Sequence, residues 1–174
     1  MKTQPESTLV EFIRYNQWAN QQLLAVCEKL SQSQLEASIS GTYGAILHTF
    51  RHMLEAEADY INRITGVRPK PPFSWDERPS FAAMSAYAAQ LGEAFLNVIR
   101  EVPPTQNVHE EENGLTMDYQ ARQLFMQVVN HGISHRTDIT TYLSSLGESV
   151  PELDNWGYMF AHMERFDLKE GKVS

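Results

Sequence analysis

Two histidines four residues apart, His131 and His135, lie in a stretch that otherwise has the pattern of an ordinary amphipathic helix. They continue the apolar stripe of Leu124, Val128 and Ile139, so both imidazoles should face the protein interior. Two imidazoles one helical turn apart can share a metal ion, but buried histidines that are hydrogen-bonded to a carbonyl or carboxylate are also common. The spacing alone leaves both interpretations open.

A metal site needs at least one more donor, and an earlier helical segment offers His48 and His52, again four residues apart. The periodicity does not choose between them and places both away from the centre of the apolar face, near the surface. Glu57, in contrast, falls in the middle of that face, where an isolated charge is costly. We therefore expect Glu57 to be either a site residue or paired and hydrogen-bonded, with Tyr60 and Tyr142 as candidate donors.

Four long helical segments must position these side chains. In each of these segments apolar residues recur at steps of three and four. In the later segments Gly or Pro follows the last residue of the apolar pattern. The expected segments are 6–30, 44–65, 81–102 and 117–146. The tail contains enough aromatic residues for one more short packed element, and no repeat, heptad run or alternating strand pattern is evident. These features predict a single all-α domain over residues 1–174, an up-down four-helix bundle with a short extra C-terminal element.

Two connecting segments differ in character. Residues 66–80 are too rich in proline for a helix and, with Phe73 and Trp75, too aromatic for a solvated linker, so we expect this segment to pack over one end of the domain. Residues 105–118 are polar and acidic. We expect a loop there, with a turn at Asn113-Gly114 and a solvated His109.

The composition limits the classes of function. The 174 residues carry a formal charge of −8, which argues against a nucleic acid partner. The sequence has neither a signal-peptide pattern nor an apolar run long enough to span a membrane, so we expect a soluble cytoplasmic protein with no membrane partner. The single cysteine, Cys27, excludes an internal disulfide and falls among the apolar positions of a helix, as expected for a small core residue.

Three segments and their spacing suggest a relationship to a known family. They are "YNQWAN" at residues 15–20, "GAILHTFRHMLEAEADYINRI" at 44–64, and "NHGISHRTDITTYLSSLG" at 130–147, the last followed by "PELD" at 151–154. Together they resemble the signatures of the DinB-like, YfiT-like family of metal-dependent proteins, over nearly the whole chain. Each motif is short, but their order and spacing together are specific.

The resemblance implies a ligand set. The first metal ligand of the family falls on His52, because Glu57 and Tyr60 follow at the expected distances, and the second and third fall on His131 and His135. Such a site implies one divalent ion held by three histidines from two helices, with the remaining coordination positions open. Zinc or nickel suits three imidazoles best. His48 is then an extra histidine one turn earlier.

The sequence departs from the family in two places. The family commonly has Arg-Gly-Gln after the last histidine, whereas this chain has Arg136, Thr137 and Asp138. It also has Asp59 where an apolar residue is usual. A carboxylate in place of the amide could orient a ligand histidine through its ring N–H, and it weakens any transfer of substrate identity from the family.

The resemblance also implies a class of activity. Members of the wider family resemble thiol transferases and isomerases, so we expect a metal-dependent S-transferase or hydrolase that uses a low-molecular-weight thiol on small electrophiles. No Ser-His-Asp order, P-loop or dinucleotide fingerprint offers competing chemistry. The alternative is a non-catalytic stress-related or binding module whose histidines or metal only clamp helices together. The resemblance also makes a homodimer a possible state of the protein, although no residues identify an interface.

Overall fold

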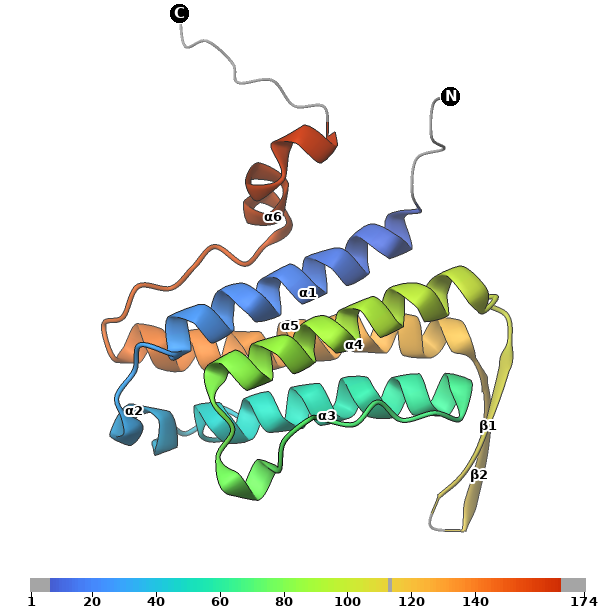
Figure 1. The fold of residues 1–174 in the computed structure, drawn as a ribbon, viewed down its shortest axis with the longest axis horizontal. Coiled ribbons are helices and arrows are strands. Elements are labelled where there is room, and N and C mark those ends of the chain that lie inside the picture. The colour runs from blue at the N-terminus through green and yellow to red at the C-terminus, as the bar shows by residue number, and fades with distance from the viewer. Residues whose placement is uncertain (1–6, 113, 167–174) are drawn as a thin grey trace, which may run out of the picture.

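Helices make up most of the molecule (Figure 1). The computed structural model describes residues 7–112 and 114–166. The long helices in this part of the chain are α1 (Thr8–Cys27), α3 (Ile46–Thr65), α4 (Phe81–Glu101) and α5 (Ala121–Ser145). The shorter elements are α2 (Gln32–Glu36), α6 (Asn155–Ala161), the 3₁₀ turns η1 (Trp75–Glu77) and η2 (Met163–Phe166), and the strands β1 (Asn107–Glu112) and β2 (Leu115–Gln120). The mostly helical architecture predicted from periodicity is confirmed.

Local sequence signals set several helix ends. Ser80, the N-cap of α4, accepts a hydrogen bond from the backbone N–H of Ala83, which satisfies one of the free donors of the first turn. At the C-terminal end of α3, Gly66 adopts a left-handed conformation with φ of 75°, which glycine allows without strain. The boundaries of α3 and α4 therefore lie close to the predicted ones.

The up-down alternation expected for the bundle is not observed, because α3 and α4 run in the same direction (Figure 1). Near the starts of these helices the rings of Phe50 and Phe81 are in contact, with centroids 6.4 Å apart. Near their ends Gln106 donates to the carbonyl of Ile64 at 3.3 Å. Each long helix still packs against two others, in the order α1, α4, α3, α5 and back to α1.

The segment 66–80 makes this parallel arrangement feasible because it returns along the whole of α3. Arg68 pairs with Asp59 near the end of that helix, and Trp75 lies beside Arg51 near its start. The expectation that this segment packs over one end of the domain is therefore wrong. Its prolines keep it extended, and an extended chain of this length can run back beside a helix.

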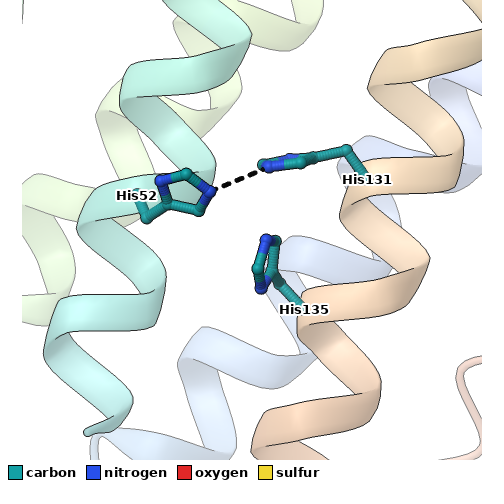
Figure 2. A group of neighbouring side chains, drawn as sticks. All are labelled: His52, His131 and His135. Carbon is teal, nitrogen blue, oxygen red and sulfur yellow. Dashed lines mark hydrogen bonds between the residues drawn. The ribbon is translucent and has the colours of Figure 1, made fainter. Parts of the chain in front are cut away.

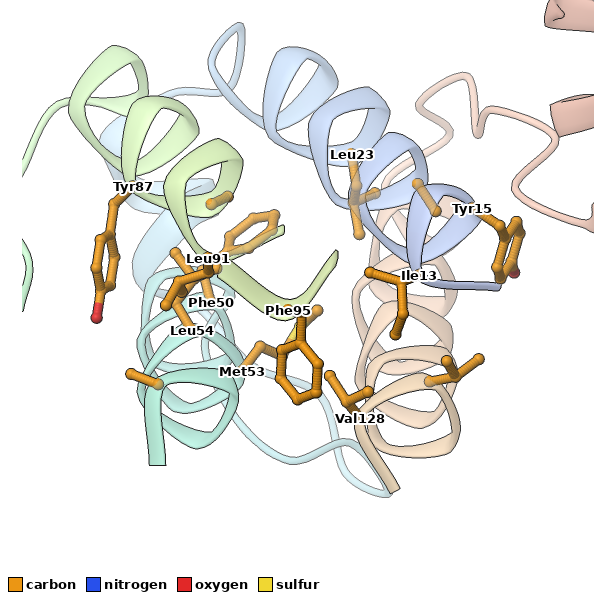
Figure 3. Packing of buried hydrophobic residues seen from close by; sticks show 14 of the residues in the cluster. Ile13, Tyr15, Leu23, Phe50, Met53, Leu54, Tyr87, Leu91, Phe95 and Val128 are labelled. Carbon is orange, nitrogen blue, oxygen red and sulfur yellow. The ribbon is translucent and has the colours of Figure 1, made fainter. Parts of the chain in front are cut away.

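The core lies between the four long helices (Figure 3). Side chains that are at most 1% exposed come from all four of them, including Leu23, Phe50, Met53, Phe95 and Val128. Cys27 is also fully buried, and burial raises the pKa of its thiol to about 12. Cys27 is therefore a core residue, as predicted, and its thiol has no nucleophilic character at neutral pH.

Residues 107–120 form a β-hairpin, so the all-α prediction and the predicted loop are wrong. β1 and β2 pair antiparallel with Val108 opposite Tyr119, and the hairpin lies at the end of the bundle where α4 ends and α5 begins (Figure 1). Among the described side chains of the hairpin only Val108 is buried, and Glu110 forms an ion pair with Arg63 of α3 at 2.8 Å. One buried apolar residue in a run of glutamates gives almost no alternating pattern.

The hairpin also shifts the start of the last long helix. α5 begins at Ala121 instead of residue 117, because residues 115–120 are taken up by β2. Gly114 adopts a positive φ of 77° at the tip of the hairpin, while Asn113, the other residue of the expected turn, lies outside the described residues. His109 is exposed, as predicted, and its ring contacts Asp118 at 2.8 Å.

The extra element predicted near the C-terminus is α6, which packs against α1. Tyr158 of α6 is buried, and its hydroxyl donates to Glu11 at 2.9 Å. Just before α6, the carbonyl of Leu153 accepts a hydrogen bond from the hydroxyl of Tyr15 at 2.7 Å. Within the described ranges, no helix combines the length and the apolar character needed to cross a bilayer.

Candidate metal centre

Three histidines from two helices converge between α3 and α5 (Figure 2). His52 lies on α3, and His131 and His135 lie one turn apart on α5. One ring nitrogen from each lies within 4.8 Å of the other two, and the Nε2 atoms of His52 and His131 are 3.0 Å apart. Two nitrogens bound to one tetrahedral ion at about 2.0–2.1 Å would lie roughly 3.3 Å apart, so small side-chain movements suffice to bind one.

The structure shows which of the two histidines of α3 can join the cluster, a choice that the periodicity of the sequence does not make. His52 is half-buried and faces α5 across a narrow gap, with ring centroids 4.9 Å from His131 and 4.7 Å from His135. His48 is exposed and lies outside the cluster, with its ring 5.3 Å from that of Tyr43. His52, the ligand implied by the resemblance, is therefore the residue that the fold brings to the other two histidines.

Burial favours the neutral form of His52 and His131, which is the form that binds a metal. Desolvation, with smaller contributions from the neighbouring histidines, lowers the pKa of His131 to about 4. Desolvation also lowers the pKa of His52, followed by the effects of His135 and His48 and opposed by Glu55. At neutral pH a metal ion would not have to displace protons from imidazolium groups at these two positions.

A carboxylate orients one of the three rings. Asp138 Oδ2 lies 3.2 Å from Nδ1 of His135, three residues earlier on α5. An ionised carboxylate only accepts, so His135 carries its proton on Nδ1 in this pair and its Nε2 lone pair remains free for an ion. Asp138 is one of the two departures from the family pattern, and its position agrees with the orienting role considered for it.

Tyr43 covers one side of the cluster, and sequence analysis missed it. Its ring stacks on His52 with centroids 4.3 Å apart and 22° between planes, and contacts His135 edge-on at 4.7 Å. Gly41 and Gly44 flank it with φ of 92° and 156°, conformations that other residues rarely adopt. A tyrosine between two glycines has no helical period, so only that short "GTYG" stretch could have indicated it.

Glu57 is paired and hydrogen-bonded, which was one of the two expected outcomes. It is 4% exposed, and its Oε1 accepts from the side-chain amides of Asn16 at 2.9 Å and Asn20 at 3.0 Å. The same two asparagines accept from Nη1 of Arg136 at 2.7 Å each. The donors are thus asparagines of α1, and not Tyr60 or Tyr142 as expected.

This network gives a physical reason for two of the sequence segments. Asn16 and Asn20 belong to "YNQWAN", and Arg136 directly follows His135. Together with Glu57 they join α1, α3 and α5 through buried polar bonds. A buried carboxyl group and a guanidinium that are bridged by two side-chain amides favour one relative placement of three helices, including the two that carry the histidines.

Two other histidines of the described residues lie elsewhere. His109 is on the hairpin, and the ring of His162 packs on Tyr158 and Trp18 near α6, with centroids 4.6 and 6.3 Å away. The other family departure, Asp59, pairs with Arg63 and Arg68 on the outside of α3. None of these side chains is part of the three-histidine cluster.

The donor set fits a divalent transition metal. It consists of three imidazoles and no carboxylate among the described residues, and hard ions such as magnesium prefer oxygen ligands. Three protein ligands from two helices leave coordination positions for water or a small ligand, as in catalytic sites. The residues would therefore hold one ion whose charge they do not neutralise.

Comparisons with known proteins agree with this description. The sequence profile of the DinB family matches residues 1–169. Protein DinB of Bacillus subtilis (strain 168) is 22% identical over 156 residues, which cover 84% of this chain and 90% of that protein.

Solved structures show a similar fold. A DinB-like protein from Bacillus cereus ATCC 10987 superposes with a TM-score of 0.61 at 18% identity, covering 82% of this chain and 93% of that one. A DinB-like protein from Bacillus subtilis gives a TM-score of 0.59 at 12% identity, covering 83% and 95%.

Proposed function

This chain belongs to the DinB family, and we propose that it binds one divalent metal ion through His52, His131 and His135. The observation that carries the proposal is the convergence of three imidazole nitrogens within 4.8 Å from two helices. Zinc or nickel is the ion that this ligand set suits best. The lowered pKa values of His52 and His131 support the proposal because they favour the neutral, metal-binding form.

We further propose that the site is catalytic, in a metal-dependent S-transferase or hydrolase that uses a low-molecular-weight thiol on small electrophiles. A bound ion with open positions would supply a lowered pKa for a thiol or water that it holds. Asp138 keeps the proton of His135 on Nδ1, so that the Nε2 lone pair faces the cluster. The ring of Tyr43 excludes water from one side of His52 and His135, which strengthens electrostatic interactions inside.

A non-catalytic metal clamp is the second candidate, and a clamp needs a fourth protein donor. The three residues best placed by sequence to supply one are engaged elsewhere. His48 lies outside the cluster, Glu57 accepts from Asn16 and Asn20, and Asp138 contacts the outer nitrogen of His135. An open fourth position supports a catalytic site over a clamp.

Elemental analysis of the purified, untagged protein tests metal binding directly. We expect about one divalent ion per chain in the wild type, loss of that ion in His135→Ala, and retention in His48→Ala. His48 is the matched control because it is a histidine of α3 one turn from His52 but outside the cluster. A wild type that stays metal-free after zinc or nickel is supplied would contradict the proposal.

The cobalt-substituted protein separates the catalytic site from the clamp. Addition of glutathione or 2-mercaptoethanol should change the visible spectrum of bound cobalt if a coordination position is open to a thiol. A folded, fully loaded protein whose spectrum does not respond to either thiol would support the clamp and count against the transferase.

A further inference from the structure

A cavity of about 280 Å³ lies beside the three-histidine cluster, between the first turns of α3, the η1 turn and the start of α4. One part of its wall is apolar and another carries nitrogen donors together with one carboxylate, that of Glu36, which pairs with Arg78. The lining side chains that matter here are Leu47, His48, Arg51, Trp75, Arg78 and Met84. A hollow with a hydrocarbon wall and a few convergent polar groups has the character of a small-molecule site.

The donors at this cavity have unfilled hydrogen-bonding capacity. Arg51 lies 3.5 Å from oxygens of Glu55 and Asp76, but no hydrogen bond from its guanidinium reaches another described residue. Arg63, in comparison, donates to Asp59 at 2.6 Å and to Glu110 at 2.8 Å. Both ion pairs of Arg51 are long, so its planar fork of N–H groups can still donate to a ligand that competes with Glu55 or Asp76.

The indole of Trp75 adds a second free donor next to that fork. Its Nε1 is buried and has no hydrogen-bond partner in the part of the chain that the structure describes. The Cζ atom of Arg51 lies 6.0 Å from the centre of the Trp75 ring. An unsatisfied buried N–H costs about 1–3 kcal/mol, so a ligand that accepts from it gains more than it would at the surface.

The other wall suits a hydrocarbon. Leu47 of α3 lines the cavity, is half-buried and packs against the core, whereas Met84, which also lines the cavity, has no exposed surface of its own. Arg78, at the rim, has a left-handed backbone with φ of 51°, a strained conformation for a residue with a side chain and one that is frequent at ligand sites. Its side chain pairs with Glu36 on the surface, and exposed pairs of this kind contribute only about 0–1 kcal/mol.

The cavity lies next to the proposed metal centre along α3. His48 lines the cavity and lies one helical turn from His52. The ring of Tyr43 bridges the two, at 5.3 Å from His48 and 4.3 Å from His52. His48 is therefore the lining residue that connects the cavity to the aromatic ring over the histidine cluster.

We propose that this cavity binds a small organic carboxylate with an apolar body. The carboxylate accepts from the fork of Arg51 and from the Trp75 indole N–H, since guanidinium and carboxylate match as planar, bidentate partners. The apolar body lies on Leu47, and its far end reaches His48. If the metal centre is catalytic, this ligand is its substrate, and that step rests on the proposed function. The binding of the carboxylate does not.

Benzoate is a suitable probe, and the three tryptophans report where it binds. In protein labelled with ¹⁵N, Trp18, Trp75 and Trp156 each give an indole N–H signal, and Trp75→Phe assigns the one of interest. Benzoate should shift the Trp75 signal saturably and leave the other two in place, while benzyl alcohol, which lacks the carboxylate, should not. Arg51→Gln should weaken benzoate binding at least about ten-fold, because the charge-assisted bonds are lost.

The control variant is Arg122→Gln, which removes another exposed guanidinium, at the start of α5 and outside the lining of the cavity. It should bind benzoate like the wild type. Equal shifts of all three indole signals, or an unchanged affinity in Arg51→Gln with a native circular dichroism spectrum, would overturn the proposal. Performing the titration on metal-free protein keeps its outcome separate from that of the elemental analysis: saturable binding there supports the carboxylate site even if no metal is ever taken up.

Discussion

The Nε2 atoms of His52 and His131 lie 3.0 Å apart, although 79 residues separate the two histidines in the sequence. Two neutral imidazoles at this distance need a proton on one of the facing nitrogens, whereas an ion between them needs a lone pair on both. Metal binding would thus replace a hydrogen bond between α3 and α5 by coordination to both helices. Metal binding at this cluster would couple occupancy of the site to the packing of the two helices.

We expect metal removal to lower stability, because an ion that binds only the folded chain stabilises it. Free metal at 100 times its dissociation constant contributes about 2.7 kcal/mol. The melting temperature of the wild type should therefore rise with added zinc or nickel and fall with a chelator. His131→Ala should melt at one temperature in both conditions, and a metal-dependent shift in this variant would show that the stabilising ion binds elsewhere.

Removal of the carboxylate of Asp138 should weaken metal binding without abolishing it. Asp138 contacts Nδ1 of His135 at 3.2 Å, and loss of such an orienting partner typically costs 10–100-fold in affinity. Asp138→Asn should show a loss in this range in a competition titration with a chromophoric chelator. Asp59→Asn, which removes a carboxylate that pairs with Arg63 and Arg68 outside the cluster, should bind metal like the wild type.

Tyr43 should control access to the metal. Its ring stacks on His52 and meets His135 edge-on, so Tyr43→Ala should open that side of the site and speed the binding of azide or imidazole to the cobalt-substituted protein, measured by stopped flow. Tyr43→Phe keeps the ring and should behave like the wild type. If Tyr43→Phe changes the rate as much as Tyr43→Ala, the hydroxyl and not the ring is responsible.

The sequence predicts the site only where its residues continue a local pattern. His131 and His135 follow the apolar stripe of α5, so their inward position could be inferred. His52 lies off the centre of the apolar face of α3, and its partners come from α5 and from the loop that carries Tyr43. A single-helix pattern contains no such information, which is why His52 was identified only through the resemblance.

The fold, like the site, could be predicted only where the sequence has a local pattern. The long helices have a strong period, but their relative directions depend on how the 66–80 segment runs, and its length allows a return along α3 as well as a passage over one end. The hairpin could not be predicted because Val108 is the only buried side chain among its described residues, and one residue makes no alternating pattern. Contacts between distant segments, such as the ion pair of Glu110 with Arg63, stabilise it and leave no periodic signal.

Glu57 should make stability depend on pH. Burial raises its pKa above the ordinary value of 4.5, against the opposing effects of Asn16, Asn20 and Arg136. The folded state then holds the proton to higher pH than the unfolded state, so this contribution is complete below about pH 4.5 and is lost as the pH rises through the folded pKa. Glu57→Gln does not titrate, so the unfolding free energy of the wild type relative to this variant should fall with rising pH.

Urea unfolding of both proteins in metal-free form, from pH 4.5 to 8, measures this difference. The metal-free condition matters because any change in metal affinity would otherwise add its own pH dependence. A difference that grows in favour of the wild type with rising pH would mean that Arg136 stabilises the carboxylate more than burial destabilises it.

Gly132 leaves the space in which the buried network forms. A methyl group there would lie 2.4 Å from Asn16 Oδ1 and 2.7 Å from Arg136 Nη1, two atoms held by the bonds that join α1 to α5. Gly132→Ala should therefore destabilise the protein by about 2 kcal/mol, the usual cost of inserting a methyl group into a packed interior, despite the better helix propensity of alanine.

Gly92 of α4 provides the matched comparison, because it is also a buried helical glycine with a close neighbour. A methyl group there would meet the side chain of Gln17, with Cδ at 2.6 Å, but Gln17 is only half-buried and its one bond, to the carbonyl of Ala89, is long at 3.5 Å. This flexible side chain can move, so the gain of about 1 kcal/mol in helix propensity should largely offset the contact. Equal losses in Gly92→Ala and Gly132→Ala, measured by urea unfolding, would show that the Asn16–Arg136 contact is as easily displaced as Gln17 and does not fix the placement of α5.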